Sequence, residues 1–357
     1  MICNLLKNEL LLTLLSHIYR IIWVIRKWLY DSGILKTRKL PCPVICVGNL
    51  TTGGTGKTPA VIALSRILGE NNHHPAILSR GYKRRSKASV LVVSDGRSIL
   101  ATPEESGDEP YLIASSLKNV PVIVGGNRYT SGIHIPDKSS ADLFILDDGY
   151  QHLKLHRDIN ILLIDASNPC GNGYLLPKGI LREPFNGISR ADCVIVTRSN
   201  EGNKNIAETL IRKYNQDVPI FYASYKTADI TNPAGKSCGF DFIKSKQIFM
   251  FAGIANPGSF RRSIEDTGGM VIGEMLYPDH YWYKNDDLNK IIKEASRLSA
   301  DAIITTAKDA VRLHGLDLYD KTGLEMKFLI LHVEMMIDKG FREWIRKSTE
   351  QLAMSNE

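Results

Sequence analysis

The chain contains, at residues 47–58, the stretch Val47-Gly48-Asn49-Leu50-Thr51-Thr52-Gly53-Gly54-Thr55-Gly56-Lys57-Thr58. An apolar run at 44–47 predicts a strand before the glycines, and apolar periodicity through 61–68 predicts a helix after them. A strand, a glycine-rich turn and Lys-Thr at a helix start form a phosphate-binding loop, in which backbone N–H groups converge on phosphate oxygens. The stretch therefore predicts nucleotide binding by Gly53, Gly54, Thr55, Gly56, Lys57 and Thr58.

The loop departs from the usual pattern at one position. Thr51 stands where the pattern G-x-x-x-x-G-K-[ST] has its first glycine, and the Gly53-Gly54 pair is expected to compensate. We expect Lys57 to reach the β- and γ-phosphates and the Thr58 hydroxyl to ligate Mg²⁺. The alternative is a flexible glycine turn without a ligand.

Composition bounds the class of protein. The chain has 357 residues, 43% of them hydrophobic, which is enough for two domains with separate cores. Its net charge of +7 lies mainly in residues 1–40, and the near-neutral remainder argues against a nucleic-acid surface. The six cysteines form no CxxC pair, so we expect them to be free. No feature indicates an obligate protein partner.

The N-terminal region is apolar but short. Its apolar run at 10–25 has about 16 residues, whereas a membrane span needs about 20. One apolar stripe recurs at helical spacing, formed by Leu11, Leu15, Ile18, Ile22, Ile25 and Leu29. Polar and basic residues occupy another side, which predicts an amphipathic helix within 1–35 that lies in a membrane interface. The alternatives are a helix packed on the protein's own core, or a dimer seam.

The remaining chain alternates short apolar runs with helical patterns. Strands are predicted at 76–78, 91–93, 120–124, 143–146, 159–164 and 194–196, and helices at 109–117, 126–134 and 203–214. A second alternation begins at 248. This pattern predicts an α/β fold with a mostly parallel sheet. We expect a phosphate-loop core at 36–225, a connector at 226–245 and a smaller α/β lobe at 246–357, with a cleft between the lobes.

Carboxylates follow one of the predicted strands. The run Leu143-Phe144-Ile145-Leu146-Asp147-Asp148 has the form of a Walker B element, whose acidic residues emerge where the phosphate loop opens. We expect Asp147 and Asp148 to hold or orient Mg²⁺. Asp165, at the end of the next strand, is interpreted as a turn residue.

Two further residues have a structural and a functional interpretation. Asp108, in Gly107-Asp108-Glu109-Pro110, is either a helix N-cap or the general base that a kinase needs to deprotonate an alcohol. His280, among the aromatic residues of 278–283, is either a packed histidine or a catalytic one. The residues alone leave both choices open.

Polar and cationic residues elsewhere are candidates for binding an anionic substrate. The basic run 79–87 contains Arg80 and Tyr82, and Asn127-Arg128 opens a predicted helix after a strand. Arg182 and Glu183 lie in a long loop, where they are candidates for phosphate and metal contacts. The alternative for the basic run is a solvated loop.

Taken together, these segments resemble the tetraacyldisaccharide 4′-kinase (lipid A 4′-kinase) family. The matching segments are VGNLTTGGTGKTP, SRGY, GDEP, GGNR, LDDGYQH, LPKGILREP, FAGIANP, YPDHYWY and TTAKDAVRL, spread from about residue 43 to 313. The resemblance implies phosphorylation, with ATP and Mg²⁺, of the 4′-hydroxyl of a lipid-linked glucosamine disaccharide 1-phosphate. It also implies a location at the cytoplasmic face of the bacterial inner membrane.

The resemblance also implies roles for individual residues. Asp108 falls on the catalytic base, and His280 on the partner that raises its basicity or relays its proton. Arg128, Arg182 and Glu183 fall on polar positions near the phosphates and the metal. One position departs from the family pattern, because Ala307 stands where TTxKD usually has Glu. A role for that position is therefore not transferred.

Two other classes of function remain as alternatives. A P-loop NTPase acting as a regulatory or metal-delivery switch would use Lys57, Thr58 and Asp147 without Asp108. A non-enzymatic membrane scaffold would need only residues 1–40.

Overall fold

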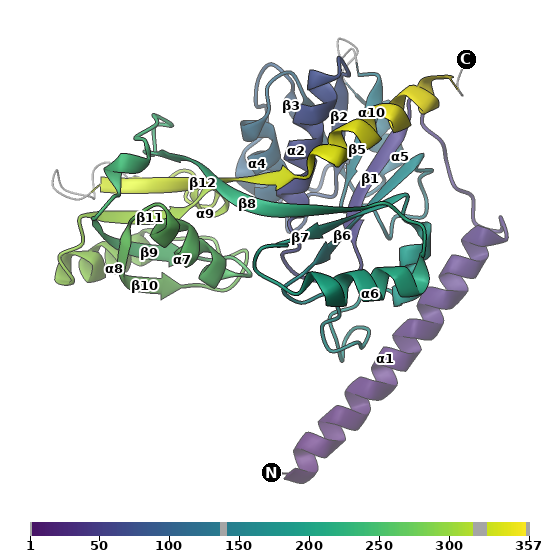
Figure 1. The fold of residues 1–357 in the computed structure, drawn as a ribbon, viewed down its shortest axis with the longest axis horizontal. Coiled ribbons are helices and arrows are strands. Elements are labelled where there is room, and N and C mark those ends of the chain that lie inside the picture. Colours follow the sequence, from purple (N-terminus) through teal and green to yellow (C-terminus); the bar gives the residue numbers. More distant parts are fainter. Residues whose placement is uncertain (1, 136–140, 317–326, 355–357) are drawn as a thin grey trace.

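One mixed sheet runs through the whole molecule (Figure 1). The computed structural model describes residues 2–135, 141–316 and 327–354. Within these residues twelve strands are ordered β10-β9-β11-β12-β8-β7-β6-β1-β5-β2-β4-β3. Helices cover the sheet, so the fold is α/β, as the sequence predicted.

The first lobe contains the phosphate-binding loop. Its parallel strands are β1 (Val44–Asn49), β2 (Pro75–Ser79), β4 (Pro121–Gly125), β5 (Leu143–Asp147), β6 (Ile159–Asp165) and β7 (Cys193–Thr197), and β3 (Val90–Asp95) is antiparallel at the edge. These parallel strands are almost fully buried, because helices cover both faces. The helices are α2 (Lys57–Glu70), α3 (Pro103–Ser106), α4 (Asp108–Ser116), α5 (Arg128–Ile133), α6 (Lys204–Tyr214) and the 3-10 helix η1 (Phe185–Arg190). The strands and helices of this lobe match the predicted ones closely.

The second lobe is smaller. It contains β9 (Gln247–Ala252), β10 (Met270–Leu276) and β11 (Ala302–Thr306), with α7 (Pro257–Asp266), α8 (Asn285–Arg297), α9 (Ala307–Val311) and η2 (Phe240–Phe242). Strands β9, β10 and β11 pair in parallel. Two apolar clusters fill its two faces, one around Ile264 and one around Ile291.

Two long strands join the lobes. β8 (Ile220–Thr231) and β12 (Lys327–Ile337) pair antiparallel, from Ala223 opposite Ile337 to Thr231 opposite Ile330. β12 leads into α10 (Lys339–Met354), which returns to the first lobe and buries Phe341 and Ile345 beside α2. Sequence analysis placed a connector at 226–245 and the following residues in the second lobe. The structure instead extends a strand to Thr231 and packs the last helix on the first lobe.

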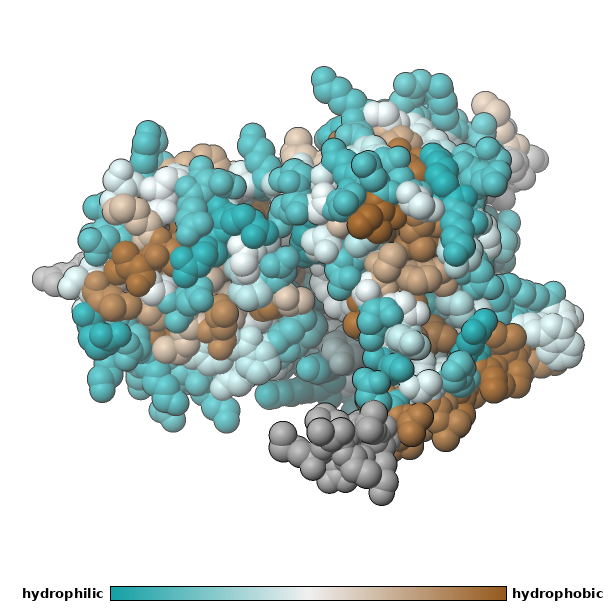
Figure 2. All heavy atoms as spheres, turned by 60° about the horizontal axis from the view of Figure 1, so that its bottom comes forward, coloured by the Kyte–Doolittle hydropathy of each residue, from teal (hydrophilic) through white to brown (hydrophobic). Residues whose placement is uncertain are grey.

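The N-terminal helix α1 (Ile2–Asp31) lies along one side of the first lobe (Figure 1). One side of α1 contacts the protein: Trp23 is buried, and the Ser16 hydroxyl donates to the Leu175 carbonyl at 2.9 Å. The opposite side exposes the predicted apolar stripe, including Ile22 at 60% exposure, and Figure 2 shows a continuous apolar band there. Among the described helices, none combines the length and the hydropathy that a bilayer crossing requires.

Candidate active site

The phosphate loop has the geometry that its glycines predict. Gly56 takes a left-handed conformation (φ 86°) immediately before α2, and a Cβ atom there would lie 1.9 Å from the Tyr225 hydroxyl oxygen. Asn49, at the end of β1, organises the loop: its Nδ2 donates to Thr55 Oγ1 at 2.8 Å and its Oδ1 accepts from Lys57 Nζ at 3.3 Å. The loop is therefore held by hydrogen bonds within the protein.

Strand-like pairing holds the start of the loop, where Thr51 stands in place of the pattern's first glycine. Thr51 forms an antiparallel bridge with Leu181, and the Thr52 N–H donates to the Ile180 carbonyl at 2.7 Å. The Arg182 N–H donates to the Leu50 carbonyl, also at 2.7 Å. The segment at 180–182 thus lies against the start of the phosphate loop.

The Walker B aspartates have different environments. Asp147 is buried and accepts a hydrogen bond from the Ser79 hydroxyl at 2.7 Å. Burial, with the nearby charges of Glu109 and Asp148, raises the pKa of Asp147 to about 7. Asp148 is half-buried, which opposes its ionisation, but the charges of Lys57 and Arg182 outweigh that effect and lower the pKa of Asp148.

Arg182 pairs with the second Walker B aspartate, Asp148. Its Nη1 donates to both carboxylate oxygens of Asp148, at 2.8 and 2.9 Å, and Lys57 Nζ lies 3.7 Å from the same carboxylate. The structure thus brings Arg182, Asp148 and Lys57 together.

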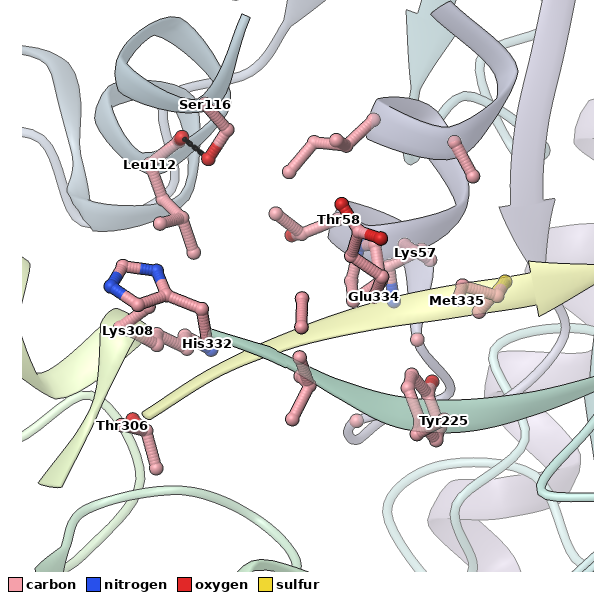
Figure 3. A pocket seen from close by; sticks show the side chains of 18 of the residues that line it. Lys57, Thr58, Leu112, Ser116, Tyr225, Thr306, Lys308, His332, Glu334 and Met335 are labelled. Atoms are coloured by element: carbon pink, nitrogen blue, oxygen red, sulfur yellow. Dashed lines mark hydrogen bonds between the residues drawn. The ribbon is translucent and has the colours of Figure 1, made fainter. Parts of the chain in front are cut away.

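A cleft of about 900 Å³ opens between the lobes (Figure 3). Lys57 and Thr58 line it from α2, Tyr225 from β8 and Met335 from β12. Leu112 and Ser116 from α4, and Thr306 and Lys308 from the second lobe, form other parts of its wall. The volume and the mixed lining are those of a small-molecule site.

Asp108 and His280 meet across the lobes. His280 Nδ1 lies 2.9 Å from Asp108 Oδ2, although 172 residues separate them in the chain. The Tyr82 ring packs edge-on against the His280 ring, with centroids 5.5 Å apart. The family resemblance implied that His280 is the partner of Asp108, and in the structure the two side chains form a hydrogen-bonded pair.

The N-cap interpretation of Asp108 is wrong. Gly107 is the N-cap of α4 and has φ 93°, and Asp108 is the first residue of the helix. A Cβ atom at position 107 would lie 2.9 Å from the Tyr82 carbonyl oxygen, so this position favours glycine. The Asp108 side chain instead reaches its partners in the second lobe.

Arg312 joins Asp108 and His280 in a three-residue cluster, and sequence analysis did not identify it. Its Nε donates to Asp108 Oδ2 at 2.7 Å, and its side chain is fully buried. Burial alone would raise the pKa of Asp108, but the His280 hydrogen bond and the charges of Arg312 and Lys308 hold that pKa below its usual range. The segment TTAKDAVRL contains Arg312, yet no local pattern distinguishes it from a surface arginine.

The remaining predicted residues are dispersed around these groups. Asn127 caps α5, and the Arg128 guanidinium is buried close enough to Asp147 to interact with its charge. Arg80 is exposed. Glu183 is fully buried: its Oε1 accepts from Gln151 Nε2 at 2.8 Å and its Oε2 from Arg190 Nη2 at 2.7 Å. In this arrangement both Glu183 oxygens accept hydrogen bonds that organise its loop.

The fold and the site define the class of this protein. An α/β sheet with a phosphate-binding loop, a Walker B pair and a carboxylate–histidine pair between its lobes is the architecture of a P-loop phosphotransferase. The family model for tetraacyldisaccharide-1-P 4′-kinase (LpxK) matches residues 8–350. The chain belongs to this family, and it is a kinase.

Individual proteins agree with this assignment. The tetraacyldisaccharide 4′-kinase of Syntrophus aciditrophicus is 40% identical over 346 residues, which cover 94% of this chain and 92% of the relative. The tetraacyldisaccharide 4′-kinase of Halothermothrix orenii is 37% identical, with 92% and 88% covered. The crystal structure of LpxK from Aquifex aeolicus in complex with ATP aligns with a TM-score of 0.77 and 34% identity, over 96% of this chain and 98% of that one.

Proposed function

We propose that the protein transfers the γ-phosphate of ATP to the 4′-hydroxyl of a lipid-linked glucosamine disaccharide 1-phosphate, a lipid A precursor. One observation carries the proposal: the phosphate loop forms one wall of the cleft, and the neighbours of the Asp108–His280 pair form another. Those neighbours are Glu109, Asp279 and Lys308. A nucleotide on the loop and an alcohol at the base would therefore share one enclosed space.

The residues around the loop fit ATP with Mg²⁺. Thr58 is the second residue of α2 and lines the cleft, and Asp147 and Asp148 supply hard oxygen donors. Within the described residues no three His, Cys, Asp or Glu side chains form a metal site by themselves. That suits Mg²⁺, which takes one or two carboxylates and completes its shell with phosphate oxygens and water. When bound, the metal neutralises phosphate charge.

Asp108 acts as the general base for the sugar hydroxyl, and His280 relays the proton. The His280 hydrogen bond lowers the pKa of Asp108, which favours a proton relay over raised basicity as the role of His280. A carboxylate of lowered pKa holds a proton only briefly. The adjoining imidazole, bonded through Nδ1, offers the proton a route onward.

The substrate is held by cations and an aromatic ring near this pair. Tyr82 is 53% exposed beside His280, so its ring is available to a sugar. Arg80, Asn127, Arg128 and Arg182 surround the loops at the ends of β2, β4 and β5 and suit anionic groups. These assignments rest on position and charge.

Helix α1 brings the enzyme to its lipid-linked substrate. Its exposed apolar stripe suits burial at a bilayer interface, and the basic residues of 1–40 suit anionic lipids. We propose peripheral binding at the cytoplasmic face of the bacterial inner membrane.

The test is transfer of labelled γ-phosphate from ATP to the disaccharide 1-phosphate lipid in detergent micelles. Wild type should label the lipid, and Asp108→Asn should lower kcat by about 10²- to 10⁴-fold. Asp217→Asn, at an exposed position, is the matched control and should leave kcat unchanged. Hydrolysis of ATP without labelled lipid would contradict the proposed reaction. Near-normal transfer by Asp108→Asn would remove Asp108 from the mechanism.

A further inference from the structure

Arg312 is a buried cation held from several sides. Its Nη1 donates to the Gly253 carbonyl at 2.7 Å and lies 3.2 Å from Asp309 Oδ1, while its Nε reaches Asp108. Its Nη2 has no hydrogen-bond partner within the described part of the chain and lies 3.9 Å from Asp279 Oδ1. Because the side chain has no solvent exposure, Arg312 does not contact a ligand in the cleft directly.

Asp309 fixes Arg312 to the core of the second lobe. Asp309 is itself fully buried, and its Oδ1 accepts from the Tyr283 hydroxyl at 2.8 Å and from the Gly253 N–H at 2.9 Å. Its Oδ2 accepts from the Thr306 hydroxyl at 2.6 Å. A continuous chain of hydrogen bonds therefore runs from the second-lobe core through Asp309 and Arg312 to Asp108 in the first lobe.

The contacts of Asp108 leave one direction open. Its Oδ2 accepts from Arg312 Nε and is hydrogen-bonded to His280 Nδ1, and its Oδ1 accepts from the Glu109 N–H at 3.0 Å. A carboxylate has about four acceptor sites, so about one remains for a substrate hydroxyl. A guanidinium stays protonated, so Arg312 restricts the carboxylate without exchanging protons with it.

We propose that Arg312 is a positioning residue for phosphoryl transfer: it orients the free acceptor site of Asp108 toward the substrate. Because Arg312 belongs to the second lobe, that orientation depends on the position of the second lobe relative to the first. This inference rests on the proposed role of Asp108 as the base. A merely structural arginine would change stability without changing the step that Asp108 performs.

The charged groups around Asp108 determine the pH dependence expected of variants. From the second lobe, His280, Lys308, Arg312 and Asp279 face this region, and Glu109 adjoins it on α4 and pairs with Lys308 at 2.9 Å. Removing the Arg312 charge leaves Lys308, already engaged by Glu109, and His280 to stabilise the carboxylate. The pKa of Asp108 should then rise, and the acidic limb of the kcat/KM profile should move to higher pH.

The experiment compares Arg312→Met, Arg312→Lys and the control Arg297→Gln in the full chain with ATP and micellar lipid. Arg297 is an exposed second-lobe arginine that pairs with Glu294. Arg312→Met should lower kcat by about 100-fold and change the KM for ATP by less than about threefold. Arg312→Lys should recover part of kcat, and Arg297→Gln should match wild type. Thermal melting and equilibrium ATP binding report whether each variant is folded.

A double-mutant cycle distinguishes positioning from structural support. If Arg312 acts through Asp108, adding Arg312→Met to Asp108→Asn should cost less than about threefold further in kcat. A further loss in kcat equal to that caused by Arg312→Met alone would overturn the proposal. So would a folded Arg312→Met enzyme with kcat within threefold of wild type, or with an unmoved acidic limb. Should Arg312→Met not fold, the same cycle with Arg312→Lys decides by the same criteria.

The controls separate this inference from the proposed function. Wild type that labels no lipid contradicts the function itself, and an active Asp108→Asn enzyme contradicts the base. An inactive Asp108→Asn enzyme together with normal Arg312 variants contradicts only the positioning role.

Discussion

The Tyr19 hydroxyl donates to the backbone carbonyl of Arg182 at 2.8 Å. This contact connects α1 with the loop whose Arg182 side chain pairs with Asp148. A cation–π contact between Trp23 and Arg190 lies in the same region, and Arg190 in turn pairs with Glu183. The amphipathic helix therefore supports the phosphate site as well as presenting an apolar surface.

Tyr19→Phe should lower kcat for lipid phosphorylation about three- to tenfold while vesicle binding is retained. The change removes one hydrogen bond, which contributes about 1 kcal/mol, and loosens the loop that positions Arg182. Kinetics in micelles and vesicle co-sedimentation measure the two effects.

The reciprocal variant is Ile22→Asp, on the exposed side of α1. It should weaken co-sedimentation with anionic vesicles severalfold and leave kcat in micelles near wild type, because Ile22 faces away from the protein. Loss of vesicle binding by Tyr19→Phe, or undiminished binding by Ile22→Asp, would contradict this division of roles.

Gly56→Ala should reduce ATP affinity by at least about 100-fold. Its φ of 86° is costly for a residue with a side chain, and the added Cβ atom would lie 1.9 Å from the Tyr225 hydroxyl oxygen and 3.0 Å from Met335 Cε. Calorimetry with ATP measures the loss. Adding Tyr225→Phe should recover only part of it, because the backbone strain remains.

Gly69→Ala, near the other end of α2, is the control. No atom lies within 4 Å of the added Cβ position, and the backbone is helical. This variant should bind ATP normally and gain about 0.5–1 kcal/mol of stability. Equal losses of affinity in both variants would show that helix composition, and not loop geometry, controls binding.

His152 should make the protein less stable in mild acid. Burial, with the charges of Arg128 and Arg157, lowers its pKa to about 3. The unfolded chain, with a histidine pKa near 6.5, binds more protons than the folded one between the two values, so stability falls as pH drops from 6.5 toward 3. At pH 5, His152 should account for about 1 kcal/mol after allowance for solvent screening.

Urea unfolding of wild type and His152→Asn at pH 7.5 and 5 measures this contribution. The variant should lose less stability between the two pH values than wild type does. An equal loss in both proteins would assign the acid sensitivity to other groups.

Phe341→Ala should destabilise the first lobe by about 3–5 kcal/mol. Phe341 is fully buried, stacks on Trp344 and lies edge-on to Phe221. Urea unfolding followed by tryptophan fluorescence measures the loss, and Phe341→Leu should cost clearly less. A negligible loss would mean that α10 is not part of the first-lobe core.

Much of the fold follows from local patterns. The buried strands β1, β5, β6 and β7 were visible because parallel strands covered on both faces are continuous apolar runs. β8 escaped prediction because its sequence IFYASYKTADIT mixes polar and apolar residues, and the turn residues that follow it suggested a connector. The docking of helix α10 on the first lobe depends on the path of β12, which no local pattern encodes.

The sequence by itself determined the phosphate loop, the Walker B pair and the candidate base, because glycine placement, apolar runs and acidic strand ends act over a few residues. Only the tertiary structure decided that Arg312 reaches Asp108 across 204 residues, and that both Glu183 oxygens are taken by Gln151 and Arg190. The physical reason is that such a contact depends on the distance between its two partners and on their burial. Both depend on how β8 and β12 hold the lobes together, and not on which residues are neighbours in the chain.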